Sequence, residues 1–464
     1  VFTDEMLYGG DTLSLGYAAR SLYAEALSTL GRVPGWAPHL LGGTPFIEAL
    51  SGGDSLYPPS VLLLMLAPPH RALGWKLVLH IFLAGIFFYS WVRAIGGSRA
   101  AGLLGGVAYM LAPFLVGFIH PGHDGKIFVT ALAPLMFWMT ERHFRDPGWV
   151  SFSGLGLVVA SIIYTTHFQM AYFLFGGVGM YAIFRSIQLG RGVDEAGFGS
   201  RPRAGALRLI LFLAASVTGA AGAAWQLLPA AEYVTEYSRR TQMTSAAIGQ
   251  VGRDWSSSFS MNPEEVASLV VPEFAGNLAG GGISWATGTY WGRNGFKDNH
   301  EYAGLIVLLL AAVSFLGGPR RQLRLFLTGL GGLAVLFSLG ANTPIWGLFY
   351  QFVPGISLFR APGMASFLFG FAVITLSALG LDRLITLASS GNAAELKRIQ
   401  KLLSVSTAAI AVLGFLIVTG IFTEMWTTLV YPDIGERQRQ VLGSHLPNIV
   451  RGCAIAMLLS AALT

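Results

Sequence analysis

The stretch MASFLFGFAVITLSALGL, residues 364–381, decides the fold class, because it runs for 18 residues without a charged side chain. About 20 apolar residues in a helix span the hydrocarbon core of a bilayer, which is about 30 Å thick. Backbone amides and carbonyls find no partner in lipid, so a segment that crosses it must satisfy them internally. The sequence therefore predicts a membrane-spanning helix over residues 364–385.

Similar apolar runs recur along the whole chain. Only 12% of the 464 residues are charged and 53% are hydrophobic, whereas a soluble domain carries about a quarter of its residues as charged ones. The runs predict about eleven spans, at 73–92, 100–119, 125–142, 150–166, 168–187, 208–228, 301–317, 323–340, 364–385, 402–424 and 448–464. We therefore expect an all-α polytopic membrane protein.

Two shorter patterns complete this picture. The apolar run at 61–67 is too short to cross a bilayer and has prolines on both sides, so it predicts an interfacial or re-entrant helix. The glycines at 102, 105 and 106 fall within a predicted span. Small residues allow two helix backbones to approach closely, so these glycines predict tight helix packing.

The charges predict the orientation. The short links at 93–99, 141–147, 185–208, 320–324 and 382–401 together hold 16 Lys and Arg against 6 Asp and Glu. Cytoplasmic loops of membrane proteins carry an excess of Lys and Arg. These links are therefore expected in the cytoplasm, and the pI of about 9.4 follows from membrane orientation rather than from nucleic-acid binding.

This topology divides the chain into four parts. A first extracytoplasmic loop at 1–72 precedes an N-terminal transmembrane bundle at 73–228, and a second long loop at 229–300 precedes a C-terminal bundle at 301–464. Since residues 1–72 must be carried across the membrane, we expect a further span before them, and an apolar run that continues beyond residue 464.

The first loop carries an amphipathic pattern at 14–30, which predicts an interfacial helix or a helix packed on other loops. Leu15, Ala18, Leu22 and Ala26 are expected on its apolar face, with Arg20 among the residues pointing away from it.

Ionisable residues gather at the outer ends of the spans, where they are unfavourable unless they are paired or functional. The densest group is HPGHDGK, residues 120–126, which could supply metal ligands, a general base or a grip on phosphate. Solvated interfacial side chains are the alternative interpretation. The candidate substrate-binding residues are His120, His123, Asp124, Lys126, Glu232, Arg239, Arg240, His300 and Arg360.

Eight short blocks together resemble the bacterial YfhO-like membrane proteins. They are GDTLS at 10–14, VPGWAP at 33–38, GGTP at 42–45, LYPP at 56–59, LGANTP at 339–344, VPG at 353–355, FRAP at 359–362 and ALGLD at 378–382. That family belongs to the GT-C glycosyltransferase superfamily, so the resemblance implies a GT-C-like helical bundle in the bacterial cytoplasmic membrane. It also implies a polyprenyl-phosphate sugar as donor and an extracytoplasmic glycan, polymer or protein as acceptor.

The resemblance also implies a catalytic acid in the first outer loop. Asp11 matches that position, and Asp54 ranks second. A carboxylate would deprotonate the acceptor hydroxyl, and cations such as Arg360 would stabilise the departing phosphate. No organic cofactor is expected, and a requirement for a divalent metal is left open as an alternative.

A second interpretation belongs to a different class of protein. The chain could be a non-catalytic GT-C-like scaffold or an accessory subunit with partner proteins. A transporter is disfavoured, because the spans at 150–166, 208–228, 323–340 and 402–424 lack ionisable residues before their ends. Cys453 is the only cysteine, which excludes an intrachain disulfide.

Overall fold

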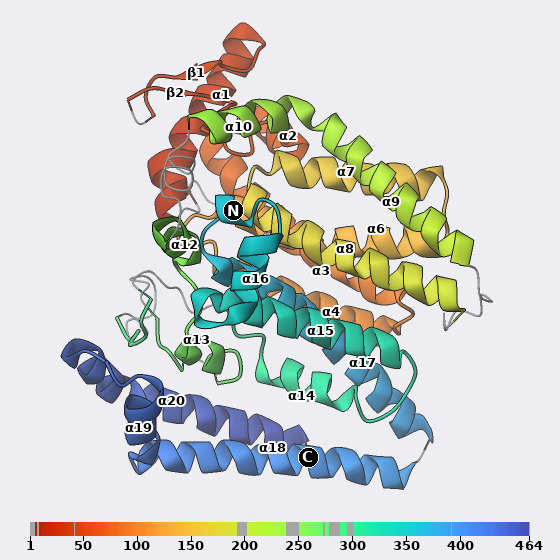
Figure 1. The fold of residues 1–464 in the computed structure, drawn as a ribbon, viewed down its shortest axis with the longest axis vertical. Helices are drawn as coiled ribbons and strands as arrows, with labels where there is room; N and C mark the ends of the chain where they lie inside the picture. The colour runs from red at the N-terminus through yellow and green to blue at the C-terminus, as the bar shows by residue number, and fades with distance from the viewer. Residues whose placement is uncertain are drawn as a thin grey trace.

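The structure is a computed structural model that describes residues 5–6, 9–40, 42–192, 202–237, 250–271, 274–277, 288–294, 301–390 and 392–463. Its described part is mainly helical, with one two-stranded antiparallel ribbon, β1 (Trp36–Ala37) paired with β2 (Thr44–Pro45). Long helices lie side by side, and short elements gather at the left end of the bundle in Figure 1. The expected all-α fold with several apolar helices is confirmed.

The first half of the chain forms a segment of short elements and then a helical bundle. The short elements are η1 (Thr12–Gly16), α1 (Tyr17–Leu30) and α2 (Pro58–Leu66). The bundle consists of α3 (Pro69–Ala94), α4 (Arg99–Met110), α5 (Pro113–Val116), α6 (Asp124–Arg145), α7 (Trp149–Tyr164), α8 (Phe168–Arg191) and α9 (Pro202–Gly222). The predicted helix at 61–67 is confirmed as α2.

The second half repeats this order. Its short elements are α10 (Ala224–Glu236), α12 (Gln250–Ser257) and α13 (Pro263–Ala267). The helices that follow are α14 (Leu305–Val313), α15 (Arg321–Ser338), η2 (Gly340–Asn342), α16 (Pro344–Phe352), η3 (Ile356–Leu358), η4 (Pro362–Ser366), α17 (Phe367–Ser390), α18 (Ala393–Val418), α19 (Ile421–Met425), η5 (Trp426–Val430) and α20 (Glu436–Leu463).

Local sequence explains where several helices begin and end. Proline occupies the first turn of α2, α3, α5 and α16, where its missing amide hydrogen is not needed and its fixed φ suits a helix. The Ser98 side chain caps α4 by accepting a hydrogen bond from Ala101 N at 3.1 Å. Gly31, at φ +60°, ends α1 in the left-handed conformation.

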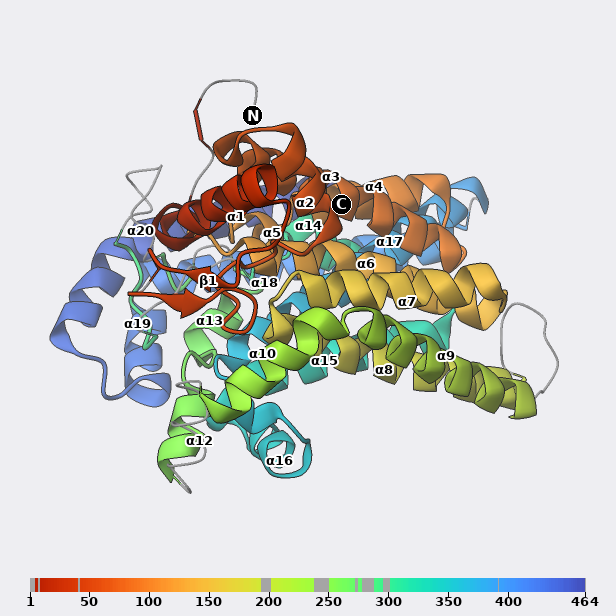
Figure 2. The ribbon, with the colours of Figure 1, turned by 90° about the horizontal axis from the view of Figure 1, so that it is seen from above.

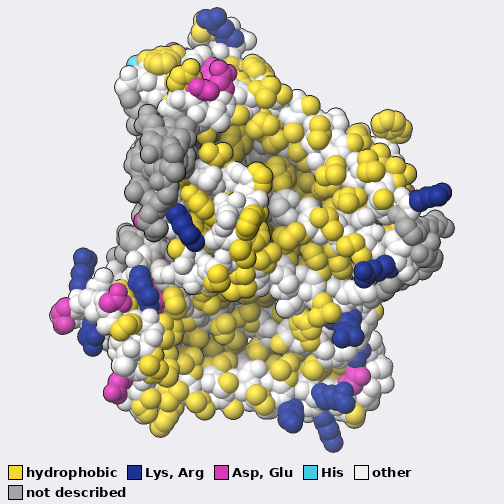
Figure 3. All heavy atoms as spheres, viewed as in Figure 1, with side chains coloured by type: hydrophobic (Ala, Val, Ile, Leu, Met, Phe, Trp, Pro, Cys, Tyr) yellow, Lys and Arg dark blue, Asp and Glu magenta, His cyan; other side chains and the backbone are white. Residues whose placement is uncertain are grey.

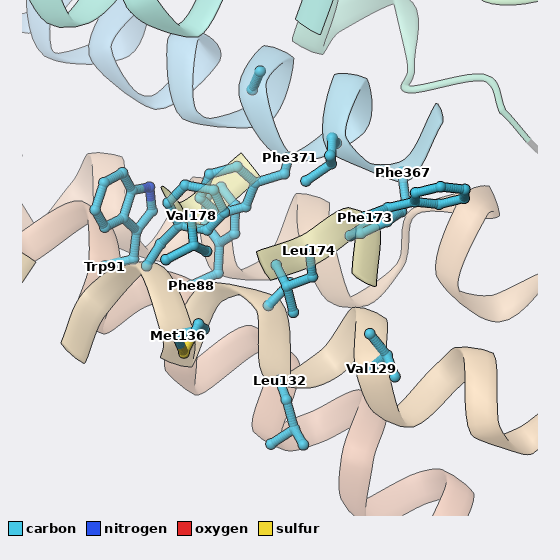
Figure 4. Close-up of a cluster of buried hydrophobic side chains, with 14 of the residues drawn as sticks. Phe88, Trp91, Val129, Leu132, Met136, Phe173, Leu174, Val178, Phe367 and Phe371 are labelled. Atoms are coloured by element: carbon cyan, nitrogen blue, oxygen red, sulfur yellow. The ribbon is translucent and has the colours of Figure 1, made fainter. Parts of the chain in front are cut away.

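Helix α17, which contains residues 367–381 of the apolar stretch, lies at the centre of the bundle. Its apolar window is 83% buried, compared with 11% for α18. Phe371 of α17 stacks on Phe137 at a centroid distance of 4.2 Å and also contacts Phe88 and Trp91 of α3. Figure 4 shows Phe88, Trp91 and Phe371 converging in this core.

Close backbone contact between α3 and α4 confirms the role predicted for the glycines. A Cβ on Gly106 would lie 2.7 Å from the carbonyl oxygen of Gly85, and one on Gly102 would lie 2.8 Å from the ring of Tyr89. Neither position can hold a larger residue without moving its neighbour.

Seven described helices are long and apolar enough to cross a membrane: α3, α4 together with α5, α8, α9, α17, α18 and α20. The other predicted spans correspond to α6, α7, α14 and α15, which are shorter or more polar. The prediction at 301–317 was too long, since α14 has nine residues. The hydrophobic side chains on the face shown in Figure 3 cover its middle, whereas Lys and Arg lie mostly toward its margins.

The two ends of the bundle differ. Helices α1, α10, α12, α13 and α19 lie at the same end in both ribbon views (Figures 1 and 2), and the connections that the structure describes at the opposite end are short. Successive long helices alternate in direction. The Arg-rich links connect consecutive long helices, so the helix ends that flank these links lie at that opposite end.

Candidate functional site

The N-terminal segment, residues 9–12, docks on the turn between α5 and α6, mainly through its backbone. Asp11 N donates to Pro121 O at 3.0 Å, and Thr12 Oγ1 donates to Gly122 O at 3.3 Å. Gly122 has φ +83°, and a Cβ there would lie 2.5 Å from Thr12 N, so the contact requires glycine. The expected proximity of residues 120–126 to the first loop is confirmed.

A chain of three polar side chains runs from this contact into the protein. Lys126 Nζ lies 2.9 Å from His123 Nδ1, and His123 Nε2 lies 3.4 Å from Asp11 Oδ2. An ammonium group can only donate, so Nδ1 of His123 acts as the acceptor. In the neutral imidazole the proton then resides on Nε2, the ring nitrogen that lies 3.4 Å from the Asp11 carboxylate.

Asp11 lines a cavity of about 360 Å³, called here the Asp11 cavity. Its side chain is 62% exposed, and it makes no capping hydrogen bond to the helix that follows. The carboxylate therefore has no role in helix capping and remains accessible from the cavity. Further residues that line the cavity include Thr12, Arg20, Leu50, Asp54, Gly122, His123, Asp124, Thr166 and His167.

A buried ion cluster forms one wall of the Asp11 cavity. Asp54 accepts hydrogen bonds from Arg20, Lys76 and Ser60. Arg20 Nη2 also donates to Asp124 Oδ2 at 2.9 Å, and Lys76 Nζ lies 3.9 Å from the same oxygen. Two cations thus meet two carboxylates, which balances the charge of a cluster that is almost wholly buried.

The two candidate catalytic acids therefore have different surroundings. Burial alone would raise the pKa of Asp54, but the charges of Lys76 and Arg20 outweigh it and hold that pKa well below its ordinary value. Asp54 is 2% exposed and is already bonded by three side chains. Asp54 is therefore suited to holding Arg20 and Lys76 in position, whereas the accessible Asp11 is suited to proton transfer.

The predicted orientation of the first helix was wrong in part. Arg20 was expected to point away from the apolar face, yet it is 5% exposed, and Leu15, expected on that face, is 44% exposed. Ala19, Tyr23 and Ala26 supply the apolar contacts of α1. The carboxylates of Asp54 and Asp124 draw the Arg20 guanidinium inward, which hydrophobicity alone does not reveal.

A second cavity of about 200 Å³, the Arg360 cavity, lies on the other side of His123. It combines the cations of Lys126 and Arg360 with the carboxylate of buried Glu301. Its aromatic wall contains Phe114, Phe118, Phe259 and Phe367. Lys126 Nζ lies 5.3 Å from the centre of the Phe118 ring. The cavity can therefore receive a ligand with an anionic group and an apolar part.

Strained backbone marks the same cavities. Among the described residues, five that are not glycine have positive φ: Leu50, Thr166, Phe259, Arg320 and Ala361. Leu50 and Thr166 line the Asp11 cavity, and Phe259 and Ala361 line the Arg360 cavity. Such conformations are unfavourable by roughly 1–3 kcal/mol each and cluster at functional sites.

The remaining candidates lie elsewhere. The side chain of His120 is exposed, and only its carbonyl takes part in the docking, by accepting a hydrogen bond from Gly10 N at 3.3 Å. Glu232 is exposed on α10 and lines neither cavity. Arg239, Arg240 and His300 lie outside the described residues.

The prediction from sequence did not include Lys76, His167 or Glu301 among the candidate site residues. A signal existed for Lys76, because an ionisable residue inside an apolar span is unfavourable without a partner. Within the described ranges, His, Cys, Asp and Glu side chains form no group of three or more that could hold a metal ion.

Comparison with known proteins identifies no relative of this chain. No protein-family model matches the chain, and no curated protein and no solved structure matches it either. Proposals about function therefore depend on the arrangement of its own side chains and on the resemblance of its short blocks.

Proposed function

We propose that this chain is a membrane glycosyltransferase of the GT-C type, which moves a sugar from a polyprenyl-phosphate donor to an extracytoplasmic acceptor. One observation carries the proposal. The accessible carboxylate of Asp11 and the cations of Lys126 and Arg360 line two cavities that share His123. Sugar transfer needs a base on one side of the reacting carbon and positive charge on the other.

The arrangement suggests a role for each cavity. An acceptor in the Asp11 cavity would give its hydroxyl proton to Asp11 as the oxygen bonds to the anomeric carbon of the sugar. The bond from that carbon to the phosphate oxygen breaks, and the phosphate leaves with its electron pair. Lys126 and Arg360 would stabilise the negative charge on the departing polyprenyl phosphate. His123 would hold Asp11 in position through its Nε2 hydrogen.

The substrate sites belong on the extracytoplasmic side of a bacterial cytoplasmic membrane in this proposal. The Arg-rich links lie at the opposite end of the bundle from the short elements, as the excess of positive charge in cytoplasmic loops requires. Helices α6, α7 and α15 would cross within the bundle beside the seven longer helices. The segment that contains α14, a helix of only nine residues, would return the chain to the cytoplasmic end and complete the eleven passages.

Cysteine labelling tests this topology. On a Cys453→Ser background, Leu30→Cys should react with an impermeant maleimide added to intact cells, and Pro147→Cys should react only after the cells are opened. Leu30 is 61% exposed and Pro147 is also exposed, so both thiols are accessible to reagent. Labelling of both variants in intact cells would contradict the proposed topology.

The donor site is tested by Arg360→Gln. We expect the KM for a polyprenyl-phosphate sugar to rise about tenfold or more, because one charged hydrogen bond to phosphate contributes about 1.5–3 kcal/mol. Proteoliposomes would receive radiolabelled undecaprenyl-phosphate hexoses and a bacterial cell-wall polymer fraction, and label in the polymer would be measured. Arg32→Gln removes an exposed charge of the first segment and serves as the control. An unchanged KM in Arg360→Gln would remove Arg360 from the donor site.

A further inference from the structure

A third cavity, of about 230 Å³, lies at the end of the bundle that carries the Arg-rich links. It is called here the Arg145 cavity, and four charged side chains line it: Glu141, Arg145, Arg185 and Arg320. They come from α6, α8 and the start of α15, which are far apart in the sequence. The Asp11 and Arg360 cavities share none of these residues.

The charge of the Arg145 cavity is positive. Glu141 is its only acid, and it is engaged by Arg185 Nε at 2.9 Å and by the Tyr181 hydroxyl at 2.6 Å. Asp382 lies behind the lining, with Oδ2 3.8 Å from Arg320 Nη1. Three guanidinium groups thus exceed the two carboxylates, which leaves a net charge of +1 around the cavity.

The cationic groups are held in place. Arg185 is 9% exposed, and its Nη1 donates to Gln188 Oε1 at 2.6 Å. Arg320 adopts φ +64° and precedes the first turn of α15, whose N-terminus has no side-chain cap. Leu323 brings that first turn into the cavity wall. The positive end of an 18-residue helix therefore adds to the guanidinium charges.

We propose that the Arg145 cavity binds a phosphate oxyanion. Planar guanidinium groups match the oxygens of phosphate, and a fixed positive cavity loses little entropy on binding it. The phosphate could belong to the headgroup of an anionic lipid at the membrane edge or to a free phosphate compound. This site is independent of sugar transfer and lies at the opposite end of the molecule from Asp11.

Thermal unfolding of the purified full chain tests this site without any sugar substrate. One arm adds inorganic phosphate in detergent, against chloride at equal ionic strength. The other arm compares nanodiscs of phosphatidylcholine with nanodiscs that also contain phosphatidylglycerol. A ligand that binds the folded protein raises the unfolding temperature. We expect a rise in one arm, and about tenfold weaker apparent affinity in Arg145→Gln.

Two variants make the result specific. The Arg145 side chain is 42% exposed, so Arg145→Gln should fold normally. Arg321→Gln is the matched control, because Arg321 is exposed next to Arg320 but does not line the cavity. A rise with inorganic phosphate identifies a free phosphate compound, and a rise with phosphatidylglycerol alone identifies a lipid headgroup. No rise in either arm, or equal weakening in Arg321→Gln, would overturn the proposal.

Discussion

Replacing Asp11 by Asn should lower the rate of sugar transfer by about 10²–10⁴-fold, the usual contribution of a general base. The amide keeps the shape of the side chain but cannot take a proton from the acceptor hydroxyl. Folding should be unchanged, because the carboxylate is 62% exposed and caps no helix. Initial rates in proteoliposomes and the unfolding temperature in detergent measure the two effects separately.

Glu25→Gln is the control for this experiment, since it removes another exposed carboxylate from the same segment. It should leave the rate unchanged. Near-normal transfer by Asp11→Asn would remove Asp11 as the base. If no transfer is detected even with the unchanged protein, the non-catalytic scaffold becomes the better interpretation.

A different result is expected for Asp54→Asn, which should lower the free energy of unfolding by about 3–5 kcal/mol. The substitution leaves Lys76 and Arg20 buried with one carboxylate, that of Asp124, between them. Unfolding followed by intrinsic fluorescence measures the loss. Asp146→Asn makes the same chemical change at an exposed position and should have little effect.

The double variant Asp54→Asn/Lys76→Met tests the cause of this loss. Removing one cation together with one acid leaves the Arg20–Asp124 pair, so part of the lost stability should return. Because the pKa of Asp54 is lowered on folding, its contribution is fully present above the ordinary value of 3.8 and is lost only as the pH falls below that. An Asp54→Asn protein as stable as Asp146→Asn would contradict a structural role for the cluster.

Hydrophobic runs predicted the helices well because lipid imposes a strict length and composition on a span. The stretch at 364–381 forms the end of η4 and most of α17, and its span is the most buried of the seven that are long and apolar enough to cross a membrane. The Arg-rich links lie at one end of the bundle. Helix α14 shows the limit of this reasoning. Residues 302–304, Tyr-Ala-Gly, are apolar or small enough to extend the run, but they are not helical, and Gly304 has φ +101°.

The candidate site was predictable only where neighbouring residues define it. The turn at 120–126 is a local cluster of charge, so His123 and Lys126 could be chosen from the sequence. Arg20 and Lys76 are separated from Asp54 by 34 and 22 residues, and the local sequence pattern does not predict that these side chains are in contact. The two cavities are likewise products of packing. The wall of the Asp11 cavity combines segments between residues 11 and 167, and the wall of the Arg360 cavity combines residues from both halves of the chain.

The docking of residues 9–12 on the turn at 120–122 has a consequence for biosynthesis. Thr12 bonds to Gly122 across 110 positions of sequence, so the contact cannot form until α3, α4 and α5 have been made and inserted. Contacts between distant residues form late, because the intervening chain must first be ordered. Asp11 therefore reaches His123 only after the first helices have assembled. A nascent or truncated chain that ends before residue 122 carries the acid without the partner that orients it.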